Sequence, residues 1–142
     1  ISDDDVWAAL EIAQAADFIR ELPEGLDAHV AQGGTNFSGG QRQRLAIARA
    51  IARKSSIYVF DDSFSALDAA TDARLRNALL EHTRESTVLL VAQRVSSVIS
   101  AHRIIVLDEG HIVGMGTHHE LLQTCATYQE IVASQQTAEA LS

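Results

Sequence analysis

The spacing of apolar residues predicts a series of helices along the chain. Near its start, apolar side chains recur at the spacing of one helical face, at Val6, Leu10, Ala13 and Phe18. Ser2 is a candidate N-cap for this helix, the aspartates after it suit a first turn, and residues 22–25 end it. Periodicity and capping residues together predict further helices at residues 38–53, at 68–83, from Thr117 and at 126–136.

Two uninterrupted apolar runs, residues 57–60 and 87–92, predict strands. Neither run alternates between apolar and polar residues, which is typical of a parallel sheet that helices cover on both faces. Residues 103–107 and 112–115 flank the sequence Asp-Glu-Gly-His, which predicts a hairpin. The connecting segments are expected to be a loop at 26–37 and a short helix or turn at 96–101. The order of these elements indicates one α/β unit without a dividing linker.

Composition excludes several classes of protein. The 142 residues are 46% apolar and 21% charged, which is an ordinary globular balance. The longest apolar runs have about five residues, against the ~20 of a membrane helix, and no secretory signal opens the chain, so the chain is expected to be soluble. A net charge of −8 argues against a nucleic-acid partner. The single cysteine, Cys125, excludes an internal disulfide.

The segment that begins at Phe37 carries the strongest chemical signal. Ser38 is placed to cap the following helix and to donate its hydroxyl hydrogen to a phosphate. Gly39 and Gly40 have no side chains, so backbone N–H groups can approach an anion closely. Ser-Gly-Gly taken alone fits an ordinary capped helix better than an anion site. The longer string Phe-Ser-Gly-Gly-Gln-Arg-Gln-Arg-Leu favours the anion site instead.

Polar residues follow both predicted buried strands. Asp61 and Asp62 end the first strand, at the edge where α/β sheets bind ligands. Asp61 suits a Mg²⁺ ion bound through water, and Asp62 is placed to orient or deprotonate a water molecule. Two solvated acids in a turn fit these residues equally well. Asp68, in the turn of residues 65–68, is a candidate helix cap, and Gln93 follows the second strand at the same edge.

These segments, in this order and at this spacing, resemble the C-terminal half of the nucleotide-binding domain of an ATP-binding cassette (ABC) transporter. Residues 37–41 resemble the signature motif, with Phe37 in place of the usual leucine. Residues 57–61 resemble the Walker B strand, and Asp62 stands at the position of the catalytic glutamate. Residues 65–68 resemble the D-loop, and Gln93 stands at the switch histidine. The exporter branch is indicated by residues 22–25, 103–116 and 117–122.

The resemblance implies a fold, cofactors and a set of site residues. The implied fold is α/β, a partial P-loop (RecA-like) parallel sheet with a helical signature subdomain at residues 1–53. Residues 54–142 would form the core, from Walker B to a C-terminal hairpin plus helices. ATP and Mg²⁺ are implied as cofactors, with Asp61 at the metal and with Asp62 and Gln93 as catalytic residues. Nucleotide contacts are implied for Ser38, Gly39, Gly40, Gln41 and Asp68.

A Walker A motif is absent from the sequence. That motif needs a lysine preceded by glycines, and the single lysine, Lys54, follows Ala-Ile-Ala-Arg. The chain is therefore expected to be half of a domain, which alone neither binds MgATP tightly nor hydrolyses it. The strand at 87–92 is expected to form an open apolar edge, which favours self-association.

The resemblance also implies partners. In this family two cassettes meet head to tail, and each signature completes the site on the other. A second nucleotide-binding domain and the transmembrane domains of an exporter are therefore expected, at the cytoplasmic face of the cell membrane. Asp62 is one methylene shorter than glutamate and Gln93 lacks an ionisable ring, whereas the signature is intact. This pattern resembles one half of an asymmetric, heterodimeric exporter. The alternatives are a soluble non-transport ABC ATPase and an isolated non-catalytic interaction module.

Overall fold

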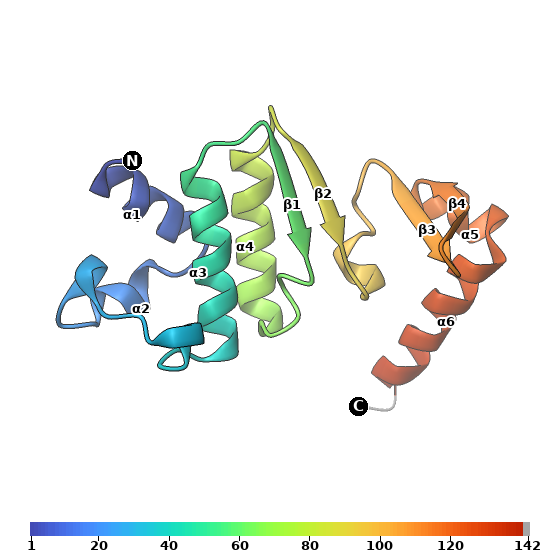
Figure 1. Cartoon of the computed structure of the whole chain (residues 1–142). Coiled ribbons are helices and arrows are strands. Elements are labelled where there is room, and N and C mark those ends of the chain that lie inside the picture. The colour runs from blue at the N-terminus through green and yellow to red at the C-terminus, as the bar shows by residue number, and fades with distance from the viewer. Residues whose placement is uncertain (141–142) are drawn as a thin grey trace. The chain divides into compact units, whose positions relative to one another are not determined.

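The structure of the chain, a computed structural model, describes residues 1–140 (Figure 1). It is an α/β fold in two compact units, residues 1–89 and the residues from 90 onward. The first unit begins with two helices and two short 3₁₀ turns: α1 (Asp3–Ile12), α2 (Ala16–Arg20), η1 (Gly25–Asp27) and η2 (Gln32–Gly34). It continues with α3 (Gly39–Ala52), β1 (Ile57–Asp61) and α4 (Ala69–His82). The following strand, β2 (Thr87–Val91), pairs with β1 in a parallel two-stranded sheet.

Capping residues fix where several helices begin, as the sequence predicts. The side chain of Ser2 caps α1 and forms a capping box with Asp5. Thr117 and Glu120 form the same arrangement before a later helix, where the Thr117 N–H donates to Glu120 Oε2 at 2.8 Å. The helices predicted at 38–53 and 68–83 are confirmed as α3 and α4. Local sequence therefore determines these helix starts without help from distant residues.

The first predicted helix is in fact two helices. α1 ends before Gln14, which takes a left-handed backbone conformation with a φ of 56°. The Gln14 carbonyl accepts a hydrogen bond of 2.6 Å from Nη1 of Arg44, which ties the break to α3. Phe18 therefore lies on α2 and not on the apolar face of α1. The guanidinium of Arg20, also on α2, lies 5.0 Å from the centre of the Trp7 ring on α1.

The core of the first unit lies among its helices and one face of β1. Ile47 and Ile51 of α3 and Leu75 of α4 are fully buried, and α1 packs against both of these helices. On β1, Tyr58 and Phe60 are 4% and 3% exposed, and their rings stack with centroids 6.1 Å apart. Removal of this apolar surface from water is the main force that stabilises the unit.

The prediction that both faces of β1 are covered is wrong for this chain. Burial alternates along the strand, because its aromatic residues are buried while Ile57 and Val59 are 65% and 60% exposed. The apolar residues of β2 are also exposed, namely Val88, Leu89 and Val91. An uninterrupted apolar run shows that a strand can be buried on both faces. Burial itself requires other helices or strands to pack against each face. Self-association through the β2 edge stays a prediction.

The second unit is built on the predicted hairpin, which is confirmed. β3 (Ile104–Asp108) and β4 (His111–Gly116) pair antiparallel, and Glu109 and Gly110 join them with φ values of 46° and 80°. Two positive φ values are typical of a two-residue hairpin turn. A 3₁₀ turn, η3 (Val95–Ser97), precedes the hairpin, and α5 (His118–Thr124) and α6 (Ala126–Ala140) follow it. The core of this unit consists of Ile104, Val106, Leu121, Cys125, Tyr128 and Val132.

Cys125 packs inside that core. Its side chain is 5% exposed, and its Sγ lies 3.8 Å from the carbonyl oxygen of Val113. A Cβ on Gly114 would lie 2.7 Å from this sulfur, which explains why β4 carries a glycine there. The thiol is therefore part of the packing between the hairpin and the helices after it.

Within residues 1–140, no helix combines the length and the hydropathy needed to cross a bilayer. The predicted boundary between residues 53 and 54 divides the chain by the proposed roles of its segments, whereas the two compact units are defined by contacts between residues. This boundary stays a prediction.

Candidate functional site

The N-terminus of α3 carries the first candidate residues. Ser38 Oγ accepts a hydrogen bond of 3.1 Å from the Gln41 N–H, and Gln41 Oε1 accepts one of 2.9 Å from the Ser38 N–H. Because the Ser38 hydroxyl only accepts in this capping box, it keeps a hydrogen to donate to an anion. Gln41, by contrast, has its carboxamide oxygen occupied within the chain. The positive end of the α3 dipole also points to this place.

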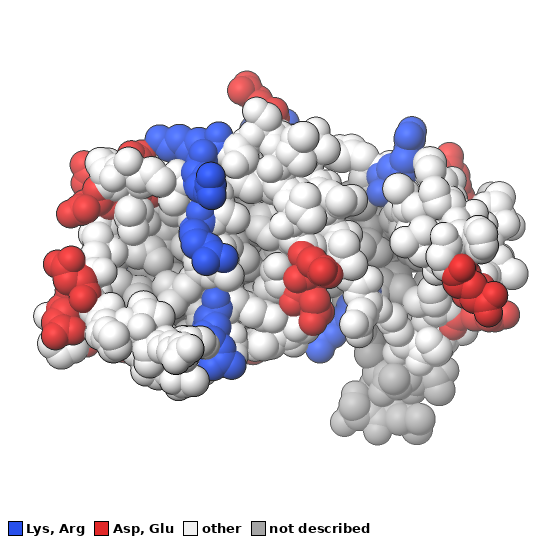
Figure 2. Space-filling view, viewed as in Figure 1, with Lys and Arg blue, Asp and Glu red and all other residues white. Residues whose placement is uncertain are grey.

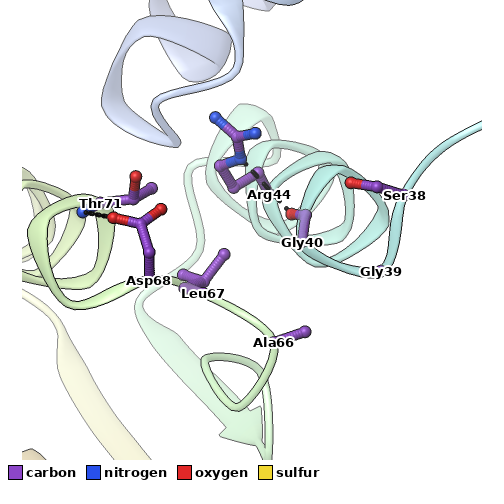
Figure 3. A pocket seen from close by; sticks show the side chains of 8 residues that line it. All are labelled: Ser38, Gly39, Gly40, Arg44, Ala66, Leu67, Asp68 and Thr71. Atoms are coloured by element: carbon purple, nitrogen blue, oxygen red, sulfur yellow. Dashed lines mark hydrogen bonds between the residues drawn. The ribbon is translucent and has the colours of Figure 1, made fainter.

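A cavity of about 390 Å³ opens beside this helix N-terminus. Figure 3 shows it between α3, the turn after β1 and the first turn of α4. Its lining residues are Ser38, Gly39, Gly40, Arg44, Ala66, Leu67, Asp68 and Thr71. A Cβ on Gly40 would lie 3.0 Å from the carbonyl oxygen of Ala66, and one on Gly39 would lie 3.6 Å from Ala66 Cβ. The glycines therefore keep open a space in which backbone N–H groups can meet a phosphate.

Arg44 forms a basic wall of this cavity. Its Nη1 donates to the Gln14 carbonyl at 2.6 Å, and its guanidinium lies 4.8 Å from the centre of the Phe18 ring. Partial burial lowers the pKa of Arg44, and the negative charge of Asp68 opposes that shift. The side chain stays protonated, because the pKa of arginine lies far above neutral pH. Figure 2 shows further Lys and Arg side chains gathered over α3, so this helix offers positive charge to an anion.

Asp68 is confirmed as the N-cap of α4. Its Oδ1 accepts a hydrogen bond of 2.9 Å from the Thr71 N–H. Hydrogen bonds from the backbone and the hydroxyl of Thr71 hold the pKa of Asp68 below its usual value of 3.8. The carboxylate thus adds negative charge to the cavity that Arg44 also lines. Contact between Asp68 and a nucleotide stays a prediction.

The capped Asp68 gives a testable dependence of stability on pH. Because its pKa is lowered in the folded state, its contribution is complete above the usual value of 3.8 and is lost as the pH falls through the lower folded value. Asp68→Asn should keep the cap and remove this part of the acid destabilisation, while Asp68→Ala should also be less stable at neutral pH. Urea unfolding at neutral pH and at about pH 3 measures both effects. Equal acid sensitivity of Asp68→Asn and the unsubstituted chain would contradict this role.

The end of β1 presents the two adjacent carboxylates that the sequence predicts, and both are exposed. Figure 2 shows an acidic group beside the end of this strand. In the described part of the chain, no side chain binds the Asp61 carboxylate. Oδ2 of Asp62, in contrast, accepts a hydrogen bond of 3.1 Å from Ser65 Oγ. Asp62 also has a left-handed φ of 47°, which aspartate adopts more readily than most residues do. Asp61 is therefore open to a cation, and Asp62 is held by its own turn.

The oxygen donors at this edge fit a hydrated magnesium ion. Mg²⁺ is usually held by one or two carboxylates together with water and phosphate oxygens. The exposed Asp61 provides one such carboxylate. Among the side chains of residues 1–136, no group of three or more metal ligands gathers, so nucleotide and water oxygens would have to complete the shell. Asp61 as a magnesium ligand stays a prediction.

Gln93 follows β2 and belongs to the second unit. Its carbonyl accepts a hydrogen bond of 2.7 Å from Nε2 of Gln135, whose Oε1 in turn accepts one of 2.8 Å from the Val95 N–H. These bonds fix the backbone that carries Gln93, while its side chain is exposed. The structure thus places the signature residues, Asp68 and the β1 carboxylates in the first unit. Gln93 lies in the second unit.

Sequence reasoning missed Gln43, which joins α3 to the turn after β1. From α3, its Nε2 donates to the carbonyl of Asp62 and to Oγ of Ser65, and its Oε1 accepts from the Ala66 N–H. These partners lie 19 to 23 positions away in the sequence, so no local pattern predicts them. The bond from Arg44 to Gln14 likewise depends on tertiary packing, because the two residues lie 30 positions apart.

A comparison with protein families matches part of this chain. The family described as ABC transporter matches residues 4–65. That stretch contains α3 with the cavity at its N-terminus, the whole of β1 and the two carboxylates that follow it.

Individual proteins match nearly the whole chain but only part of their own length. An uncharacterized ABC transporter ATP-binding protein of Mycobacterium tuberculosis is 51% identical over 135 residues, which are 95% of this chain and 23% of that protein. An ATP-dependent lipid A-core flippase of Photobacterium profundum is 42% identical over 127 residues, 89% of this chain and 22% of the flippase. A solved bacterial Atm1-family ABC exporter with ATP bound has a TM-score of 0.91 and 36% identity, over 95% of this chain and 24% of the exporter. The chain spans about a quarter of the length of these proteins.

Proposed function

We propose that the chain belongs to the ABC transporter family and that it is the C-terminal half of a nucleotide-binding domain that energises an exporter. The observation that carries the proposal is the open N-terminus of α3, where Ser38, Gly39 and Gly40 line one cavity. Backbone N–H groups and the helix dipole favour a phosphate group there. The likeness to a flippase and to an exporter supports the transport class.

Each candidate residue has a chemical role in this proposal. ATP supplies the phosphate bond whose hydrolysis drives the transport cycle, and Asp61 would hold the magnesium ion that accompanies it. Ser38 donates its hydroxyl hydrogen to a phosphate oxygen, beside the N–H groups of Gly39 and Gly40. The charged pair of side chains that line the cavity, Arg44 and Asp68, sets the charge around that phosphate.

The carboxylate at Asp62 and the amide at Gln93 are the proposed catalytic residues of the site on this chain. Asp62 would orient a water molecule, and Gln93 would hydrogen-bond a phosphate. Asp62 is shorter than the family's glutamate, and its Oδ2 already accepts a hydrogen bond from Ser65. A carboxylate held back by about 1 Å can lower a rate by ~10²-fold. This site would therefore mainly hold ATP, while the intact signature would complete the hydrolytic site of a partner.

The proposal includes partners and a location. The partners are a second nucleotide-binding domain, on a different chain in the asymmetric arrangement, and the transmembrane domains of the exporter. The location is the cytoplasmic face of the cell membrane. No nucleic-acid partner is proposed, because the chain has a net charge of −8.

A titration of the purified chain with MgATP tests the half-domain proposal. We expect no tight binding and no hydrolysis, because a Walker A lysine is missing. The single lysine, Lys54, follows the C-terminus of α3, at the opposite end from the cavity, and its Nζ lies 2.6 Å from Asp5 Oδ1. Calorimetry measures the binding, and phosphate release measures the hydrolysis.

The matching control is the full-length protein that carries this chain, which should bind and hydrolyse ATP. Tight binding by the chain alone would mean a phosphate site other than the one proposed. Absence of hydrolysis by the full-length protein and its partner would overturn the assignment as a transport ATPase.

A further inference from the structure

We propose that Gln43 is a positioning residue that fastens the turn carrying Asp62 to the signature helix α3. The inference rests on the proposed function, because it concerns the same site. It adds a residue that neither the signature motif nor the Walker B strand includes. Its basis is a set of hydrogen bonds between one side chain and three residues of one turn, Asp62, Ser65 and Ala66.

The carboxamide of Gln43 uses both of its ends. Its Nε2 donates to the carbonyl of Asp62 at 3.1 Å and to Oγ of Ser65 at 3.0 Å. Its Oε1 accepts a hydrogen bond of 2.9 Å from the N–H of Ala66. The side chain is half-buried, so these bonds are partly shielded from competing water. Only the carboxamides of glutamine and asparagine carry an NH₂ group with two donor hydrogens beside an acceptor oxygen, and the side chain of asparagine is shorter.

Ser65 extends this contact to the carboxylate. Its Oγ lies 3.2 Å from the carbonyl oxygen and 3.1 Å from Oδ2 of Asp62. Gln43 therefore touches the backbone of Asp62 directly and its carboxylate through one hydroxyl. The left-handed φ of Asp62, 47°, is a backbone conformation that surrounding bonds must hold in place. Gln43 provides one of those bonds.

The consequence is that Gln43 couples the signature to the turn of Asp62, although the two are proposed to serve different nucleotide sites. α3 carries Ser38 at its N-terminus, and that signature is proposed to serve the partner's nucleotide. The turn of residues 62–66 carries Asp62, which is proposed to serve this chain's own nucleotide. Ala66, whose N–H binds Gln43, also lines the cavity beside Ser38. A displacement of the turn of residues 62–66 would therefore be transmitted to α3 through Gln43, and a displacement of α3 would be transmitted to the turn in the same way.

Two substitutions test this inference in the full-length protein and its partner. Gln43→Met keeps the length of the side chain but removes every hydrogen bond to the turn. We expect its kcat for ATP hydrolysis to fall about tenfold with a nearly unchanged KM, because Ala66, which lines the cavity beside Ser38, is no longer held to α3 and the geometry of the signature rather than affinity is altered. Gln43→Glu keeps an acceptor for Ala66 but loses the donors to Asp62 and Ser65. We expect it to lower kcat as well.

Amide hydrogen exchange at Ala66 supplies a readout independent of turnover. We expect faster exchange at Ala66 in Gln43→Met and slow exchange, as in the unsubstituted protein, in Gln43→Glu. Gln136→Glu is the control, because Gln136 is exposed on α6 in the other unit and should change neither quantity.

The outcomes separate this inference from the proposed function. Unchanged Ala66 exchange in Gln43→Met overturns the contact, whatever the ATPase does. Normal kcat in both Gln43 variants overturns the positioning role. Absence of ATPase activity in the unsubstituted protein instead overturns the proposed function, and exchange at Ala66 then still tests the contact.

Discussion

Replacing Ser38 with arginine should abolish ATP turnover by the full-length protein and its partner, a loss of at least about a hundredfold. The change removes the hydroxyl at the N-cap of α3 and places a long side chain at the cavity lined by Gly39 and Gly40. Phosphate could then no longer approach the N–H groups of the helix. If this signature completes the partner's hydrolytic site, no other residue of the chain replaces it. Steady-state phosphate release measures the effect.

Two matched variants show whether the loss is specific to this site. Ser2→Arg makes the same change in the same kind of capping box, on α1 and outside the cavity, and should leave turnover nearly unchanged. Asp62→Asn should reduce turnover much less than Ser38→Arg does, because the site of Asp62 is proposed mainly to hold ATP. Equal abolition by the two variants would refute the asymmetric arrangement. Normal turnover in Ser38→Arg would refute the assignment of the cavity.

Truncation of Leu75 to alanine should lower the free energy of unfolding of the chain by about 2–5 kcal/mol. Leu75 lies on α4 with a side chain that is 0% exposed, so the loss of its methyl groups leaves a cavity in the core of the first unit. Urea unfolding followed by circular dichroism measures the change.

Leu80→Ala is the control for this prediction. Leu80 lies on the same helix but is 61% exposed, so its truncation should change stability by about 0.5 kcal/mol or less. A similar loss of unfolding free energy in the two variants would contradict the burial of Leu75 and the exposure of Leu80.

Sequence predicts the parts of this fold that local chemistry controls. The residues that follow each position predict four helix caps, and each caps a helix in the structure: Ser2, Ser38, Asp68 and Thr117. The hairpin was predicted in the same way, from the turn residues between two apolar runs. Each of these signals acts within four positions of the sequence, so tertiary contacts cannot change it much.

Sequence could not predict features that distant residues decide. Gln14 breaks the first helix although no proline or glycine marks the place, and Arg44 binds the exposed carbonyl from 30 positions away. Ile57 and Val59 are exposed because the cover of a strand depends on other elements and not on the strand itself. For the candidate site, motifs in the sequence indicate Ser38 and Asp62. Gln43, which connects them, was found only from its contacts.

The ring contact between α1 and α2 gives the molecule a built-in optical reporter. Trp7 is the single tryptophan of the chain, and it is half-buried beneath the guanidinium of Arg20. Indole emission excited near the red edge of absorption therefore comes from the first unit alone. The far-ultraviolet circular dichroism signal, in contrast, sums helices from both units. Recording both signals during one denaturation distinguishes the unit that holds the signature from the unit that holds the hairpin, without a label or a second chain.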